Sequence, residues 1–448
     1  MANNSVDAKN ENKTENKPSN KSKHKTQDCR AVDQGMAAWL QVLVGFLFTI
    51  NTFGLISAFG VFQANYMDTF RMSPSYISWI GSTPVFLLSF FGTFAGRLID
   101  AGYFYLLVVT GGILQVIGIF SASFAKHYWQ ALLSQGVTVG LGNGLVWTPG
   151  IWLIATHFDK KKGLAIGISS TGAPIGAVIF TVVSQQLIPL LGVKVCLRVM
   201  AAFVLLNNSI AIAAAHPRKP SKSRRGPLIE WSAFAQPDYS LFCVGIFFTY
   251  LAVWFVVYYI PAFGQHVLHL PASTSLTTLI IMNSTGLLGR ILVPWLSDHF
   301  HGPLPNLCIC TLFSASCIFA WMCVANLAGL EAFVAFYGFF WHALQTLFTA
   351  ACASITTNQA KLGTRMGMCF TVVSFAVLVG PPVGGALVTG DGGGYLYAQI
   401  CAGGAYVIGA SFVGAAWLLQ QRNKMKEEEL QKKSVEAFLK LPASGLIV

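Results

Sequence analysis

The feature that most limits how this chain can fold is a series of long apolar segments. About twelve such segments recur along the chain, and each has the roughly 20 residues that a helix needs to cross a bilayer. Of the 448 residues, 54% are hydrophobic and 10% are charged, whereas a soluble chain has about 25% charged residues. The sequence therefore predicts an all-α membrane protein with twelve transmembrane helices.

A polar stretch rich in Pro and Arg divides these segments into six and six. We predict a polar N-terminal tail at 1–35, a six-helix bundle at 36–215, a linker at 216–238, a second six-helix bundle at 239–420 and a C-terminal tail at 421–448. The spans are expected near 37–63, 76–99, 103–125, 129–157, 163–190, 195–215, 240–264, 274–297, 305–326, 331–355, 363–389 and 396–420.

The two halves echo each other. Gly172-Ala173-Pro174-Ile175-Gly176 lies in the fifth span, and Gly380-Pro381-Pro382-Val383-Gly384 lies at the matching place in the eleventh. This indicates two six-helix pseudo-repeat bundles around a central cavity. Proline loosens or kinks a helix, so these segments are either hinges or static kinks. The predicted hinge residues are Gly172, Pro174, Gly176, Gly380, Pro381 and Pro382.

The basic residues indicate how the chain is oriented. The net charge is +12, and most Lys and Arg fall in the two tails and in alternate connections between spans. Positive residues gather on the cytoplasmic side of membranes, so both termini are expected in the cytoplasm and no nucleic-acid partner is expected. The lipid bilayer is an expected partner. Because no sorting signal is visible in the sequence, the plasma membrane is the default location. The ten cysteines show no zinc spacing, so no metal or cofactor is expected.

An ordered set of motifs resembles a known family. The set includes Asp33-Gln34-Gly35-Met36-Ala37-Ala38-Trp39, Ile77-Ser78-Trp79-Ile80-Gly81, Lys160-Lys161-Lys162-Gly163-Leu164-Ala165, Gly289-Arg290 and Gly363-Thr364-Arg365-Met366-Gly367-Met368. The chain resembles fungal monocarboxylate-porter-like members of the major facilitator superfamily. The resemblance implies the major facilitator fold, transport by alternating access, and a gate in which Asp100 and Asp298 end equivalent helices, with Arg97 close to Asp100.

Two positions depart from this family pattern. Ser57 stands where members that carry lactate-like acids have a lysine, and Gly286 stands one turn before Arg290 where they tend to have an aspartate. The resemblance therefore implies the fold more firmly than the cargo.

Arg290 lies inside the eighth apolar segment. A charge there costs roughly 2.5–3.5 kcal/mol even on lenient insertion scales, so we predict that Arg290 binds an anionic group of a substrate. The alternatives are an arginine that reaches the headgroups or one that pairs with Asp298. No acidic residue falls clearly inside a span, and His342 is the candidate for coupling to protons.

Further polar and aromatic residues could line a cavity. Tyr250 and Trp254 share one face of the seventh span, and Asn51, Asn143 and Asn283 carry amides in other spans. The alternative is that these residues only pack in the protein core. The predicted function is transport of a small organic acid or acidic secondary metabolite. A carrier of a neutral or bulky metabolite and a transporter-like nutrient receptor are the alternatives. No catalytic cluster suggests an enzyme.

Overall fold

The computed structural model describes residues 35–158, 162–218, 230–300, 302–356 and 362–439, and within these ranges the chain forms helices and no strand. The predicted N-terminal tail lies outside the described residues apart from Gly35. Most of the predicted linker and the end of the C-terminal tail lie outside them too.

The first half of the chain forms five apolar helical stretches. The first stretch contains a π-helical turn, η2, and the fourth contains another, η3; such turns are frequent at functional sites. The elements are α2 (Met36–Thr49), η2 (Ile50–Gly54), α3 (Leu55–Ser57), α4 (Phe59–Phe70), α5 (Pro74–Asp100), α6 (Phe104–Ala122), α7 (Tyr128–Ala131), η3 (Leu132–Thr138), α8 (Val139–His157), α9 (Lys162–Ser170) and α10 (Gly172–Ala214).

The second half begins with a short helix and continues with six long ones. Proline occupies the first turn of α12 and α14, where its missing N–H has no helical partner in any case. Asn326 caps α15 by accepting from the Gly329 N–H at 2.8 Å. The elements are α11 (Trp231–Phe234), α12 (Pro237–His266), α13 (Ala272–His299), α14 (Pro303–Trp321), α15 (Leu327–Ile355), α16 (Leu362–Gly390) and α17 (Leu396–Leu439).

The described residues contain twelve membrane-spanning segments. Eleven helical stretches there are long and apolar enough to cross a bilayer, and one of them, Leu164–Ala214, has 51 residues. Gly192 interrupts that stretch with φ 80° and ψ 165°, a backbone conformation that is not helical. The stretch is therefore the fifth and sixth spans joined at Gly192. At the far end of the chain, α17 continues as one helix well past the span end predicted at 420.

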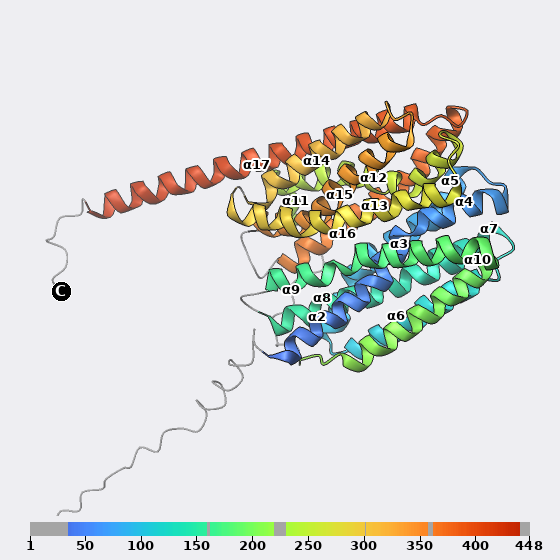
Figure 1. The fold of residues 1–448 in the computed structure, drawn as a ribbon. Coiled ribbons are helices and arrows are strands. Elements are labelled where there is room, and N and C mark those ends of the chain that lie inside the picture. Colours follow the sequence, from blue (N-terminus) through green and yellow to red (C-terminus); the bar gives the residue numbers. More distant parts are fainter. Residues whose placement is uncertain (1–34, 159–161, 219–229, 301, 357–361, 440–448) are drawn as a thin grey trace, which may run out of the picture.

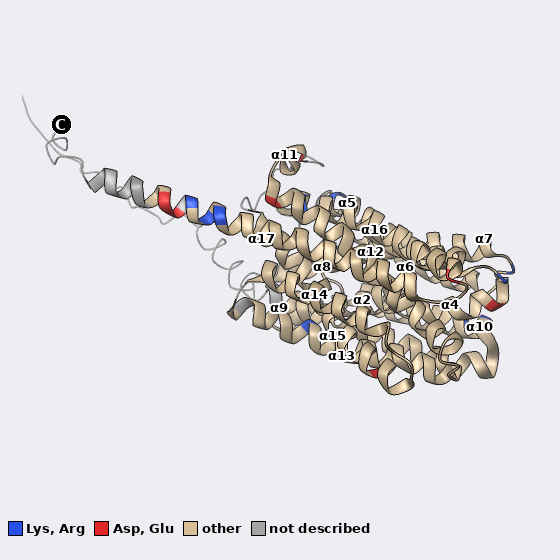
Figure 2. Ribbon diagram, turned by 90° about the horizontal axis from the view of Figure 1, so that it is seen from above, with Lys and Arg blue, Asp and Glu red and all other residues tan. Residues whose placement is uncertain are grey.

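The helices run side by side, and α2 begins at the same end of the bundle at which α17 leaves it (Figure 1). We call this the terminal end. Coloured by charge, the bundle carries few Lys, Arg, Asp or Glu residues between its ends (Figure 2). Such a surface suits a hydrocarbon environment.

Contacts between the halves of the chain occur at both ends of the bundle. The helix pairs α5 with α16, α10 with α13 and α4 with α12 join helices of the two halves. Near the terminal end, the Thr93 hydroxyl donates to the Gly367 carbonyl at 3.2 Å. Near the opposite end, the Gln185 amide donates to the Ser273 carbonyl at 2.8 Å.

The glycines of the two echoed segments allow close helix packing. A Cβ on Gly176 would lie 2.7 Å from the Ile50 carbonyl oxygen of the first span, and one on Gly380 would collide with the Leu251 carbonyl of α12. α16 runs through Pro381 and Pro382 without a break, whereas α10 begins at Gly172, directly after the turn residue Thr171 that separates it from α9. Bending at these segments during transport stays a prediction.

Candidate functional site

Arg290 of α13 is buried and held by three neutral acceptors. Its Nε donates to His342 Nδ1 at 2.9 Å, its Nη1 to the Ser170 carbonyl at 3.1 Å, and its Nη2 to Gln345 Oε1 at 2.8 Å. The side chain is only 8% exposed, so it does not extend outward to a headgroup region. His342 and Gln345 belong to α15, and Ser170 belongs to the first half of the chain. The guanidinium therefore joins α13, α15 and α9.

No carboxylate neutralises this charge among the described residues. The ion pair found there joins Arg365 to Glu230, and the Asp298 side chain lies outside the described part. A guanidinium has five N–H donors, and the three contacts leave one donor on each terminal nitrogen.

The hydrogen bonds fix the tautomer of His342. Because Arg290 Nε can only donate, His342 Nδ1 must accept and carries no proton. The proton then sits on Nε2, which donates to Asn283 Oδ1 at 3.2 Å, while Asn283 Nδ2 donates to the Leu279 carbonyl at 2.8 Å. In this arrangement His342 is neutral and is a fixed acceptor for Arg290.

Gly286 explains how the imidazole reaches this position. A Cβ on Gly286 would overlap the His342 ring. The ring therefore fills the space beside α13 that a side chain at 286 would need. Where the family pattern suggests an aspartate close to the arginine, this chain places a neutral imidazole, which accepts a hydrogen bond and leaves the positive charge uncompensated.

Buried donors without partners lie close to this cluster. Gln345 Nε2, Trp254 Nε1 and Trp341 Nε1 have no hydrogen-bond partner among the described residues. The rings of Trp254 and Trp341 meet edge to face with centroids 5.6 Å apart, and Trp341 also lies 4.2 Å from the His342 ring. Tyr250 packs against Phe348 at 5.4 Å. A ligand rich in acceptor oxygens would satisfy such donors.

The predicted amides of the first half lie in an interhelical network. Asn51 donates to Asn208 Oδ1 at 2.8 Å and accepts from Asn207 Nδ2 at 2.7 Å. Asn143 accepts from Gln115 Nε2 at 2.7 Å, and its own Nδ2 has no partner within the described part of the chain. The structure thus brings Asn283, His342 and Arg290 together in one cluster and places Asn51 and Asn143 in another.

The predicted gating residues lie at the ends of α5 and α13. Asp100 ends α5 and Asp298 lies in the last turn of α13, and both side chains fall outside the described part. Arg97 is exposed. Their gating role stays a prediction.

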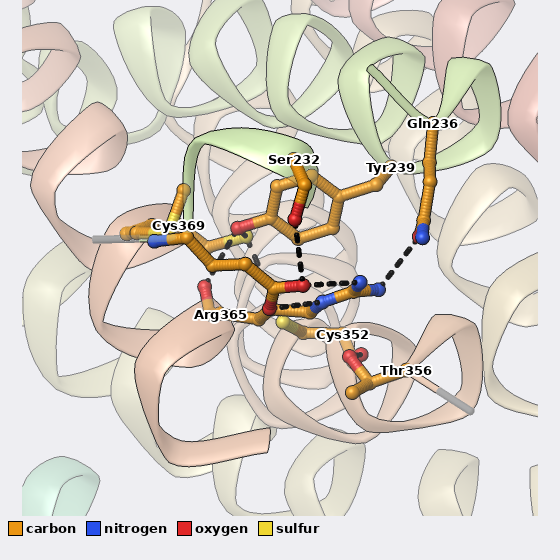
Figure 3. A network of polar contacts seen from close by, with 9 residues as sticks. Ser232, Gln236, Tyr239, Cys352, Thr356, Arg365 and Cys369 are labelled. Atoms are coloured by element: carbon orange, nitrogen blue, oxygen red, sulfur yellow. Dashed lines mark hydrogen bonds and ion pairs between the residues drawn. The ribbon is translucent and has the colours of Figure 1, made fainter. Parts of the chain in front are cut away.

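A second buried arginine, Arg365, is paired with a carboxylate (Figure 3). Arg365, 3% exposed, donates from Nε to Glu230 Oε2 at 3.1 Å and from Nη2 to Oε1 at 3.2 Å. Its Nη1 donates to Gln236 Oε1 at 2.8 Å, and the Tyr239 hydroxyl donates to its carbonyl at 2.8 Å. This bidentate pair fastens the start of α16 to the segment before α12, which indicates a structural role.

Three kinds of residue in or near the site were not identified from the sequence alone. The first is Ser170, which accepts from Arg290 through its backbone carbonyl. The second is the first-half amides, Gln115, Asn207 and Asn208, although two adjacent asparagines inside an apolar span were a usable signal. The third is the Arg365–Glu230 pair, because two residues so far apart in the sequence carry no pairing pattern. Among the described residues, no group of His, Cys, Asp or Glu could hold a metal ion.

One cavity lies apart from this cluster. It has a volume of about 650 Å³ and lies between α14 and α15. Phe313 and Phe336, which line it, are 50% and 65% exposed, so it opens on the lateral surface of the bundle. It contains none of the residues that contact Arg290.

Comparison with known proteins gives a consistent picture. Residues 42–364 match the family model described as Major Facilitator Superfamily. A protein of Gibberella zeae named MFS-type transporter is 39% identical, over 86% of this chain and 87% of the relative. The aspyridones efflux protein apdF of Emericella nidulans is 30% identical, over 85% of this chain and 79% of the relative. The fujikurins efflux protein of Gibberella fujikuroi is 29% identical, over 90% and 87%.

A solved structure shares the fold. The crystal structure of a bacterial homolog of the human lysosomal transporter Spinster, in an inward-facing and occupied conformation, superposes with a TM-score of 0.63. It is 17% identical in sequence, and the alignment covers 85% of this chain and 96% of that chain.

Proposed function

The chain belongs to the Major Facilitator Superfamily, and from this premise we propose that it exports an acidic secondary metabolite by alternating access. Two relatives are named as efflux proteins for fungal metabolites, which supports export and a metabolite cargo. On the ordered motifs of its sequence we also place it close to the fungal monocarboxylate-porter-like members.

One observation carries the acidic character of the cargo. Arg290 is buried in a membrane-spanning helix, and its three acceptors within the described residues are all neutral. A buried charge is costly unless it is paired. An anion carried by the cargo would supply that pairing, and the spare N–H donors of Arg290 with Gln345 Nε2 would receive its oxygens.

The position of Arg290 between the halves gives it a part in the transport cycle. Its bond to the Ser170 carbonyl links α13 of the second half to α9 of the first. When the two bundles rock to expose the site, this bond breaks and a donor becomes free. A cargo carboxylate can then take the place of the carbonyl oxygen. Arg290 would thus bind cargo and respond to the relative position of the halves.

The remaining roles follow from this assignment. Arg290, Asn283, Tyr250, Trp254, Asn51 and Asn143 form or support the binding region, with Asn283 acting through His342. Protonation of His342 at Nδ1 would break its bond to Arg290, which makes His342 the coupling group if protons drive export. The terminal end of the bundle would face the cytoplasm, in the plasma membrane, with Asp100, Arg97 and Asp298 at the inner gate.

Transport into proteoliposomes tests this function. Protein is reconstituted with aromatic carboxylic acids or their methyl esters as cargo, and uptake or release is followed over time. We expect the acids to be transported and Arg290→Met to abolish this transport. Arg290→Lys, which keeps the charge without the planar fork, should retain part of it.

Three results would contradict the proposal. Equal transport rates for acids and esters in the wild type would show that the cargo need not be anionic. Acid transport that persists in Arg290→Met would show that Arg290 does not bind the acidic group of the cargo. Acid binding without any transport would favour a nutrient receptor.

A further inference from the structure

Five buried amides in the first half form one continuous hydrogen-bonded chain. Asn207 donates to Asn51 at 2.7 Å, Asn51 to Asn208 at 2.8 Å, Asn208 to Gln115 at 2.8 Å, and Gln115 to Asn143 at 2.7 Å. The chain crosses from α10 to η2, back to α10, then to α6 and finally to α8. Each of these side chains is 7% exposed or less.

Two backbone carbonyls fix the direction of this chain. Asn207 Nδ2 also donates to the Leu47 carbonyl at 3.0 Å, and Asn51 Nδ2 to the Val204 carbonyl at 3.4 Å. A carbonyl oxygen can only accept, so reversing either amide would set two oxygens against each other. Every donor therefore points from Asn207 toward Asn143, and the amide chain ends on an N–H₂ group.

That final donor has no partner. Asn143 is fully buried, its Oδ1 is occupied by Gln115, and its Nδ2 has no hydrogen bond among the described residues. A buried donor left unsatisfied costs about 1–3 kcal/mol. Hydrogen bonds in a chain polarise one another, which makes the terminal donor a stronger one.

The position of Asn143 on α8 gives this donor access to the second half. Trp147 lies one turn further along the same face. Its ring packs at 5.4 Å against Phe370 of α16 and at 5.4 Å against Phe53 of η2. Through Trp147, this face of α8 reaches toward η2 and α16, and we place the cargo between the halves beside it.

We propose that Asn143 Nδ2 is a second recognition point, which donates a hydrogen bond to an uncharged carbonyl oxygen of the cargo. Asn207, Asn51, Asn208 and Gln115 are positioning residues that orient and polarise this donor. The inference rests on the proposed function, because it assumes that a cargo enters between the halves. It restricts the cargo class to acids that also carry a neutral carbonyl group.

The test compares ligands with and without that carbonyl group. The probes are the ring isomers of acetylbenzoic acid and benzoic acid itself, each as the acid and as its methyl ester. Affinities are measured by calorimetry on the full chain in detergent. For at least one isomer we expect the acetyl group to improve affinity about threefold to tenfold, the range of one neutral hydrogen bond, in both the acid and the ester.

Asn143→Asp is the decisive variant. It still accepts from Gln115 but presents oxygen where the wild type presents N–H₂, and it should remove the acetyl advantage. Asn143→Ala, which has no side-chain donor, serves the same purpose if the aspartate variant does not fold. The ratio of acid to ester affinity reports on Arg290 and should stay unchanged in the uncharged alanine variant, so failure here is distinguishable from failure of the proposed function.

Three outcomes would overturn the inference. In the first, no isomer gains from its acetyl group in the wild type. In the second, the gain survives in both Asn143 variants. In the third, the variants weaken acetylated and plain probes equally while the ligand-free protein melts at a lower temperature, which would show a purely structural amide.

Discussion

Replacing Gln345 by glutamate should give Arg290 a permanent counter-charge. Gln345 Oε1 already accepts from Arg290 Nη2 at 2.8 Å, and glutamate has nearly the same shape. The substitution therefore turns a neutral hydrogen bond into a buried ion pair without new steric overlap. If the Arg290 guanidinium binds an anionic cargo, an internal carboxylate will compete with that cargo for the guanidinium.

The size of the effect follows from the bonds that the cargo would lose. Hydrogen bonds to charged groups contribute about 1.5–3 kcal/mol each, and each 1.4 kcal/mol is a factor of ten in affinity. Gln345→Glu should weaken binding of an aromatic acid by roughly tenfold to 150-fold, and it should leave the methyl ester nearly unaffected. Calorimetry in detergent measures both affinities on the same preparation.

Gln345→Met is the matched control. It removes the same neutral acceptor and adds no charge, so the preference for acid over ester should persist. If Gln345→Glu retained the full preference for the acid, the charge on Arg290 would not be what recognises the cargo, and the reasoning would fail.

Three further predictions test other parts of the structure. Glu230→Gln breaks a buried ion pair and should lower the free energy of unfolding by about 3–5 kcal/mol, measured by denaturant titration. The control is Ser232→Ala, which removes only a hydroxyl that donates to the same carboxylate. It should lower the free energy of unfolding by about 1 kcal/mol. Asn207→Leu leaves Asn51 Oδ1 without its donor and should destabilise by about 1–3 kcal/mol in the same assay, and an unchanged midpoint would argue against the amide chain. If protons drive export, protonation of His342 breaks its bond to Arg290, so wild-type transport should depend on pH and His342→Gln should lose this dependence. An identical pH profile in the variant would eliminate His342 as the coupling group.

The membrane fold could be predicted from the sequence because lipid imposes simple rules on length and hydropathy. About twelve spans were expected, and the described residues contain twelve, with the fifth and sixth joined at Gly192. The first span was predicted to end near 63, but its helix extends to Phe70, because Gln63, Ala64 and Tyr66 pack inside the protein and hydropathy alone does not register such contacts.

The candidate site was only partly predictable. A lone arginine in an apolar segment is visible in any sequence, so Arg290 could be singled out, and Asn283 and His342 were named beside it. What the sequence could not show is how they connect. The contact between His342 and Arg290 depends on the missing side chain of Gly286, and Ser170 contributes a backbone carbonyl, which every residue type has.

A structure with a bound acid would test the central claim most directly. The protein is to be solved with an aromatic carboxylate that it transports. The account predicts a carboxylate oxygen about 2.7–2.9 Å from the Arg290 guanidinium, the distance of a charge-assisted hydrogen bond. A bound acid that lies elsewhere, with Arg290 still donating to Ser170, His342 and Gln345, would contradict it.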